Sequence, residues 1–404
     1  MRLRHLIALG ATVVGSLGLA MPAVHADTVP VGNIPSVAGT GFDGLNDIVN
    51  SGGSDTTYLV QQQITNLYNS SNGCITNDTA GTRDICTVPA PKGYTNTTMG
   101  NYDHDVVSQV HATGSGGGIA CMLATAVCNI PLDMARSSRV PSAAEFTAGA
   151  NGWAYGKDGV IVVTLGSRLA FQFDKPTLQA IYCTHTITDF NQIAGYTGPA
   201  GAIVPWGMNT ASGTYGVFKA YLGCDPSIAP NRALSSGTYP FENDVNQIVA
   251  DVTPAILSNS IWWMSYAEWK TLPFKTNSAT VNYWKIQNAA GQFRAPSNSG
   301  INATNGTSGS YNEELKRYIW QVTKKADADS AAITYPTITG GAGGKSGAVR
   351  EYVRWLCENP ADSAINPNTG ANSADDISAS ITNTGFIAVP TAERNFGTCL
   401  LQRA

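Results

Sequence analysis

The order of apolar and polar positions predicts strands and helices that alternate along the chain. Residues 159–164 form a continuous, largely β-branched run, which is typical of a strand buried on both faces of a sheet. Two further apolar runs predict strands at 203–206 and 260–266, and the glycine-rich run 114–118 predicts a turn. Apolar residues at helical spacing predict helices within 53–68, 175–182, 242–257, 311–325 and 346–359. This alternation favours an α/β fold.

A small polar loop, residues 53–57, runs straight into the first predicted helix. Ser54 or Asp55 is placed to cap that helix by accepting a hydrogen bond from a first-turn N–H group. The other first-turn amides stay free at the positive end of the helix dipole, so the loop offers a cradle for an anion. A single loop of this kind is more often a plain cap than a binding site.

Two more hydroxyl-rich segments stand farther along the chain. Residues 211–214 repeat the loop-to-helix construction, and 136–139 hold two serines between two arginines. In open α/β sheets ligands lie beyond the carboxyl ends of the strands, so we expect the three segments to meet at one edge. Amides and hydroxyls would then hold a small oxyanion, and Arg136 or Arg139 would add a charge-assisted contact. Asp55 would either accept a hydrogen bond from a protonated anion or only cap the helix.

The N-terminus predicts a cleaved secretory signal. Arg2 and Arg4 precede an apolar stretch at 6–20, and small residues at 24 and 26 mark a cleavage site before Asp27. No cysteine stands at this site, so we expect no lipid anchor and a periplasmic or secreted protein. Without Arg2 and Arg4 the chain holds 22 basic and 28 acidic residues, a net charge near −6. We therefore expect neither nucleic acid nor an anionic membrane as a partner.

Composition and cysteine usage fit an exported protein of about two domains. Charged residues make up 13% of the 404 positions, about half of the usual quarter. All eight cysteines follow the signal, and an even count in an exported chain predicts four disulfides. Pairing in sequence order closes the shortest loops and is the expected pattern: Cys74–Cys86, Cys121–Cys128, Cys183–Cys224 and Cys357–Cys399.

No motif for catalysis, metal binding or nucleotide binding occurs in this chain with the residue spacing that its function requires. No Cys-x-x-Cys or paired histidines suit a metal, and Lys345-Ser346 lacks the first glycine of a phosphate-binding loop because position 339 is Thr. No Gly-x-Ser-x-Gly elbow occurs, and only three histidines follow the signal. A secreted hydrolase with a triad assembled in space stays open. We expect no enzyme, no catalytic residues, no metal and no cofactor.

Six segments, in their order and spacing, resemble the phosphate-binding proteins of ABC importers: 133–139, 158–163, 178–182, 187–193, 212–218 and 261–266. The resemblance covers most of the chain after the signal and is clearest from 130 to 266. It implies an α/β, periplasmic binding protein-like II fold with two lobes, two crossover strands and a ligand cleft between the lobes. Lobe 1 would combine 27–158 with 262–404, and lobe 2 would span 159–261.

The resemblance implies a monomeric solute-binding protein that binds phosphate or a similar small oxyanion for an ABC importer, without covalent chemistry. The family's charged positions are Met208 and Ser138 in this chain. The alternative is a secreted or cell-surface protein that reuses the fold for adhesion, scaffolding or anion sequestration. From the resemblance and the loop chemistry together, the candidate ligand-binding residues are Ser54, Asp55, Thr56, Ser137, Ser138, Arg139, Ser212, Gly213 and Thr214.

Overall fold

The computed structural model describes residues 48–71, 106–166, 168, 171–241, 245–272, 281–328, 373–395 and 399–403, together with positions 349, 352, 353, 356 and 357. The predicted signal segment 1–26 and the predicted pair Cys74–Cys86 lie outside the described residues.

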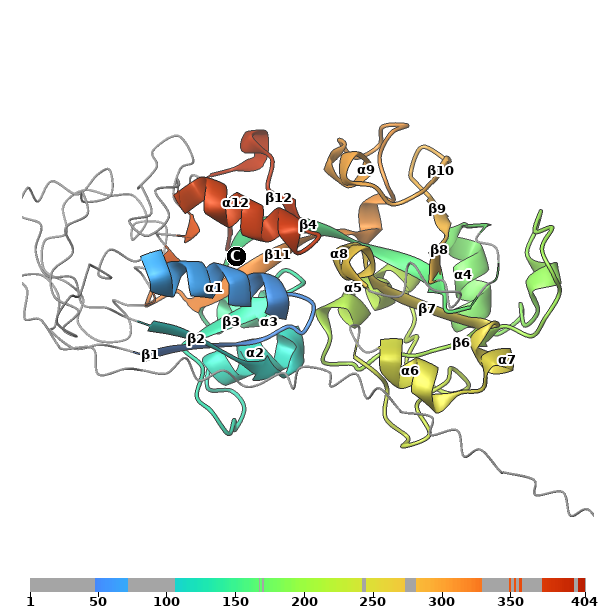
Figure 1. Cartoon of the computed structure of the whole chain (residues 1–404), viewed down its shortest axis with the longest axis horizontal. Helices are drawn as coiled ribbons and strands as arrows, with labels where there is room; N and C mark the ends of the chain where they lie inside the picture. Colours follow the sequence, from blue (N-terminus) through green and yellow to red (C-terminus); the bar gives the residue numbers. More distant parts are fainter. Residues whose placement is uncertain are drawn as a thin grey trace, which may run out of the picture.

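One long strand, β4 (Ala150–Thr164), connects two lobes, and all of its residues are buried. Its first part pairs with β11 (Lys316–Lys324) in the first lobe, and its last part pairs with β7 (Ser260–Ser265) in the second. Figure 1 shows the lobes side by side, with β4 running from one into the other. The chain passes into the second lobe along β4 and returns along β11, so these two neighbouring strands are the crossovers.

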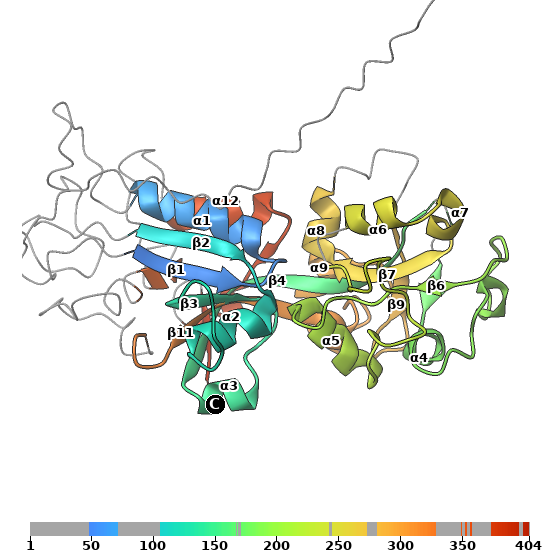
Figure 2. The same cartoon turned by 90° about the horizontal axis from the view of Figure 1, so that it is seen from below.

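The sheet of the first lobe has the strand order β2-β1-β3-β11-β4, and β12 (Ile387–Ala388) and β13 (Leu400–Gln402) also pair with β4. Helices cover both faces of this sheet (Figure 2). The strands β1 (Ile48–Gly53), β2 (Val106–Ala112) and β3 (Met134–Ser137) run parallel to one another. In Figure 2, α1 (Tyr58–Ser71) and α12 (Ser373–Asn383) cover one face and α2 (Gly114–Met122) lies on the other. The remaining elements of this lobe are α3 (Ala143–Thr147) and a 3-10 turn at Thr391–Glu393.

The second lobe has an aromatic core around the far part of β4. Trp263 of β7 stacks on Phe218 with ring centroids 4.5 Å apart, and Trp284 stacks on Phe173 at 4.2 Å. The strands are β5 (Gln172–Phe173), β6 (Val204–Pro205), β7, β8 (Asn282–Tyr283), β9 (Lys285–Gln287) and β10 (Phe293–Arg294). The helices are α4 (Lys175–Tyr182), α5 (Gly213–Leu222), α6 (Val245–Asp251), α7 (Pro254–Leu257), α8 (Tyr266–Thr271) and α9 (Asn298–Asn302), with 3-10 turns at Phe190–Gln192 and Glu313–Leu315.

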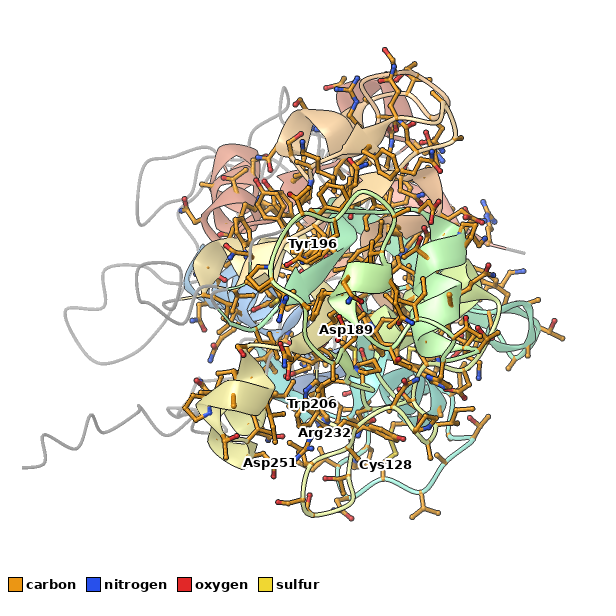
Figure 3. All side chains as sticks on the ribbon, turned by 90° about the vertical axis from the view of Figure 1, so that its right-hand side faces the viewer. Cys128, Asp189, Tyr196, Trp206, Arg232 and Asp251 are labelled. Atoms are coloured by element: carbon orange, nitrogen blue, oxygen red, sulfur yellow. A yellow bond between two sulfur atoms is a disulfide. The ribbon has the colours of Figure 1, made fainter. Side chains whose placement is uncertain are left out.

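The second lobe contains a cation–aromatic contact between Arg232 and Trp206. The Arg232 guanidinium lies 5.1 Å from the ring centre of Trp206, and its Nη2 lies 3.8 Å from Asp251 Oδ2. Figure 3 shows these three residues together in the end-on view of this lobe. The contact ties the loop after α5 to α6.

Residues 281–315 pack with the second lobe. Trp284, Ile301 and Leu315 belong to the same buried cluster as Trp263 and Val162. The division expected from the sequence places this segment in lobe 1 and predicts a return near 262. Apolar side chains of 281–315 contribute to the core around the far part of β4.

Several predicted elements are confirmed and two are wrong. The strands at 159–164, 203–206 and 260–266, the helix at 175–182 and a helical segment interrupted at Pro254 are all present, and the described positions 349, 352, 353 and 356 are helical. The helix predicted at 311–325 is the strand β11, because β3 and β4 pair with it on both sides. The predicted turn at 114–118 is the start of α2. The first predicted helix is present as α1, which begins at Tyr58, and its Leu59 side chain is 48% exposed.

The cysteine pairing is confirmed at three of the four predicted bridges. Cys121–Cys128, Cys183–Cys224 and Cys357–Cys399 are disulfides in the structure. The second of these ties the C-terminal end of α4 to the residue that follows the αL cap of α5. Among the described helices, none has the length and apolar character needed to cross a bilayer.

Candidate functional site

Four buried hydroxyl groups meet where the two lobes touch. They belong to Thr56, Ser115, Ser138 and Thr214, and we call them the hydroxyl cluster. Thr56 Oγ1 lies 3.4 Å from Ser138 Oγ and 3.4 Å from Thr214 Oγ1, and Ser115 Oγ lies 3.4 Å from Ser138 Oγ. All four side chains are fully buried. The oxygens are farther apart than the ~2.8 Å of a good O–H···O bond, so each hydroxyl can turn to a stronger acceptor.

Thr56 is positioned by the loop that follows β1. Gly53 has a φ of +128°, a conformation that glycine adopts without strain, and the chain turns sharply there. Ser54 N then donates to Arg136 O at 3.0 Å, and Tyr58 N donates to Asp55 O at 3.0 Å as α1 begins. The parallel pairing of β1 with β3 therefore brings this loop beside the end of β3, at the carboxyl edge of the sheet.

Ser115 and Ser138 are joined by a backbone contact. The amide of Ser138, just after β3, donates to Ser115 Oγ at 3.1 Å. Ser115 lies in the first turn of α2, which packs closely on β1: a Cβ on Gly118 would lie 2.4 Å from Gly53 Cα. The glycines of the 114–118 run therefore allow the helix to bring Ser115 to the site.

The second lobe contributes the first turn of α5. Ser212 caps this helix, since its hydroxyl accepts from Thr214 N at 3.0 Å and from Tyr215 N at 3.3 Å. Gly213 lies against the first-lobe serines: a Cβ there would lie 2.3 Å from Ser138 Oγ and 2.5 Å from Ser115 Oγ. The absence of a side chain at 213 is what lets the two lobes approach so closely.

A buried ion pair adjoins the cluster. Arg317 of β11 and Asp158 of β4 are cross-strand partners, and Arg317 Nη2 lies 2.7 Å from Asp158 Oδ2. Another nitrogen of the same guanidinium, Nη1, donates to Thr214 Oγ1. The side chains of Arg317 and Asp158 are 3% and 0% exposed, so this charge pair is screened little by solvent.

Arg136 lies beneath the loop of Thr56 and is wholly buried. Its Nε donates to Ser54 O at 3.2 Å, and its Nη1 donates to Gln109 Oε1 at 2.8 Å. Burial lowers the pKa of Arg136 to about 10, while the nearby carboxylate of Asp55 acts in the opposite direction. Arg136 thus holds the loop by its carbonyl groups. Ser54 Oγ is buried and has no hydrogen-bond partner within the part of the chain that the structure describes.

Two candidate residues point away from the cluster. Ser137 Oγ donates to Arg139 O at 2.6 Å and accepts from Arg139 N at 3.2 Å, so it closes its own turn. The Arg139 guanidinium forms two 2.8 Å bonds with Glu145 and also donates to Val140 O. These two residues shape the loop that presents Ser138. Met208 is buried in the second-lobe core.

Three residues of the site are not among those expected from the sequence. The glycine-rich surroundings of Ser115 indicate a turn rather than a ligand. Arg317 and Asp158 lie in strands whose patterns carry no ligand signal, and they meet only because β11 pairs with β4. Of these three residues, only Ser115 could have been suspected from the sequence, because its hydroxyl is flanked by glycines.

The two-lobed fold and the hydroxyl cluster agree with the family that the comparison identifies. The model for the PBP superfamily domain matches residues 90–357, which is more than half of the chain. The chain therefore belongs to the PBP superfamily. No curated protein sequence matches it.

Three solved structures to which this chain is similar are described as phosphate-related proteins. A protein from Clostridium perfringens, described as a phosphate ABC transporter substrate-binding protein and solved with bound phosphate, is 14% identical with a TM-score of 0.52, covering 85% of this chain and 100% of that one. An ABC-type phosphate transport receptor from Vibrio cholerae is 15% identical, with a TM-score of 0.48 and coverage of 85% and 100%. A phosphate-binding protein from Stenotrophomonas maltophilia is 15% identical, with a TM-score of 0.45 and coverage of 85% and 91%. At such identities the likeness to the first structure establishes the two-lobed fold and nothing finer.

Proposed function

We propose that this chain is an exported solute-binding protein that binds phosphate or a similar small oxyanion and presents it to an ABC importer. The observation that carries the proposal is the hydroxyl cluster, in which four buried hydroxyls from both lobes lie within 3.4 Å of a neighbour. A solute-binding protein has to enclose its ligand between lobes and replace the ligand's hydration shell. Hydroxyl and amide donors at helix starts suit that task for a small anion.

Within this proposal the ligand set differs from the one expected from sequence. The anion would accept hydrogen bonds from the hydroxyl cluster, that is, from Thr56, Ser115, Ser138 and Thr214. Ser54 would contribute through its backbone, and Gly213, which has no side chain, would allow a close approach. Ser212 would act through its cap on α5, and Ser137 and Arg139 would support the loop of Ser138. We propose that binding proceeds without covalent chemistry, that the signal at 1–26 directs export, and that the protein acts as a monomer. The proposed lobes are 27–158 with 316–404, and 159–315.

Calorimetric titration of the purified protein tests the function. We expect heat and a single site with phosphate or sulfate, and no heat with an uncharged sugar. A flat trace with both anions would contradict the proposal and favour the alternative of a scaffold without transport.

A phosphatase assay on the same preparation tests the absence of chemistry. We expect no turnover of a phosphate monoester above the buffer rate. Turnover that disappears in Ser138→Ala would mean that the hydroxyl cluster belongs to an enzyme.

A further inference from the structure

The Arg317–Asp158 pair stands at the crossover between the lobes and reaches the hydroxyl cluster. Arg317 Nε and Nη2 donate to the same oxygen, Asp158 Oδ2, at 3.1 and 2.7 Å. The remaining nitrogen, Nη1, is directed across to Thr214 Oγ1 on the second lobe. One face of the guanidinium is therefore fixed on β4, and its other end contacts the proposed anion site.

The carboxylate that fixes Arg317 is itself held by two more donors. Asp158 Oδ1 accepts from Ala267 N at 3.0 Å, and Oδ2 accepts from Ser265 Oγ at 2.8 Å. Both donors lie at the start of α8, where the chain leaves β7. With four hydrogen bonds the carboxylate has a single orientation, and it pre-organises the guanidinium so that Nη1 keeps its direction.

The other two arginines near the site already bond other acceptors, although Arg136 Nη2 has no hydrogen-bond partner within the described part of the chain. Arg136 bonds the carbonyl and amide oxygens beneath the Thr56 loop, and Arg139 is paired in bidentate fashion with Glu145. Hydroxyls alone carry no net charge, whereas moving a small anion out of water into a buried site is costly without a cation close by. Arg317 is buried, charged and already bonded to a cluster hydroxyl.

We propose that Arg317 is the charged ligand of the oxyanion, with Asp158 as its positioning residue. Nη1 would donate to an anion oxygen beside Thr214, while Nε and Nη2 stay on Asp158. Because Thr214 Oγ1 accepts from Arg317, its own hydrogen points elsewhere and is available to the same anion. The inference rests on the proposed function and adds to it the source of the site's positive charge.

A charge-neutral double variant tests this assignment. Arg317→Met with Asp158→Asn removes both charges together, so no lone carboxylate is left buried, and the oxygen of the new side-chain amide can still accept from Ala267 N. We expect phosphate to bind about 10- to 100-fold more weakly than to the wild type, as for the loss of a hydrogen bond to a charged group. Lys316→Met is the matched control, since it removes a positive charge from the same strand outside the cluster, and its dissociation constant should stay within about twofold.

The outcomes separate this inference from the proposed function. Wild-type protein that binds neither phosphate nor sulfate would refute both. If the wild type binds phosphate and the folded double variant binds it with the same dissociation constant, the role of Arg317 is refuted but the proposed function is not. If the double variant does not fold, a crystal structure of the wild type grown with phosphate decides: an anion oxygen within hydrogen-bond distance of Arg317 Nη1 supports the inference, and an anion held only by hydroxyls and amides overturns it.

Discussion

Thr56 and Thr214 are 158 positions apart in the chain, yet their hydroxyl oxygens lie 3.4 Å from each other across the boundary between the lobes. Thr56 belongs to the loop between β1 and α1, and Thr214 belongs to the first turn of α5. A movement of the lobes that opens the boundary between them would separate these two oxygens. The contact therefore links the position of the lobes to the integrity of the proposed anion site.

Neighbouring serines in one loop make a matched pair for mutation. Ser138→Ala removes a cluster hydroxyl, and we expect the dissociation constant for phosphate to rise about 10- to 100-fold. This is the range for the loss of a hydrogen bond to a charged group. Ser137→Ala removes a hydroxyl that bonds only to the backbone of Arg139 in its own turn, and binding should change by about threefold at most. Calorimetry on both variants measures the difference. Equal losses in the two would contradict the placement of the cluster.

Two glycines of α5 offer a second matched pair. In Gly213→Ala the new methyl group would lie 2.3 Å from Ser138 Oγ, so the lobes have to move apart and phosphate binding should be lost. In Gly216→Ala the nearest atom is Arg139 Cδ at 3.6 Å, an ordinary contact, and the helix should gain up to about 1 kcal/mol. Thermal unfolding and phosphate titration of each variant test this. Normal phosphate affinity in Gly213→Ala would show that the close approach at 213 is unnecessary.

The Arg139–Glu145 pair predicts a dependence of stability on pH. Burial raises the pKa of Glu145, but hydrogen bonds from Arg139 and Ser142 outweigh it and leave the pKa below 4.5. A carboxyl whose pKa is lower in the folded state contributes stability above pH 4.5 that is lost as the pH falls through the folded value. Denaturant unfolding should therefore show that acidification lowers the free energy of unfolding less in Glu145→Gln than in the wild type. The difference should be up to about 1 kcal/mol, the scale of a partly exposed ion pair. Parallel pH profiles for the two proteins would argue against this role.

Disulfide removal should affect the two lobes unequally. Cys183–Cys224 joins residues 41 positions apart, and Cys121–Cys128 joins residues 7 apart. Loop-closure entropy in the unfolded chain predicts losses of about 4 and about 2.5 kcal/mol for the two bridges. Differential scanning calorimetry of the paired Cys→Ser variants should give the lower Tm for the variant without Cys183–Cys224. The reverse order would mean that native-state contacts, and not chain entropy, dominate.

Local features of this protein could be read directly from neighbouring residues. The Ser-x-x-Glu spacing at 142–145 is that of a capping box, and the structure has it: Glu145 N donates to Ser142 Oγ at 3.3 Å. Ser212 caps α5, and the run at 159–164 is a strand buried along its length. Such features depend on groups a few positions apart, whose interaction the chain's own geometry determines.

The resemblance to a known family adds the segments of the site but not the role of each side chain. Ser137 and Ser138 are equal candidates in the sequence, and only the structure shows that the hydroxyl of Ser138 lies against Gly213 of the second lobe while that of Ser137 closes a turn. Successive residues of an extended chain point to opposite sides, so the register of β3 against β1 and β11 decides which serine contacts the other lobe.

By itself the sequence determined the α/β class, the helix caps at Ser142 and Ser212, the buried strand at 159–164 and three bridges that pair the nearest cysteines in order. Tertiary structure alone decided that residues 316–324 form a strand, that Ser115 joins the site, and that Arg317 meets Asp158. The reason is physical: hydrogen bonds and apolar periodicity within a few residues act in any surroundings, whereas contacts between residues 23 to 159 positions apart exist only once the packing of both lobes has brought their strands into register.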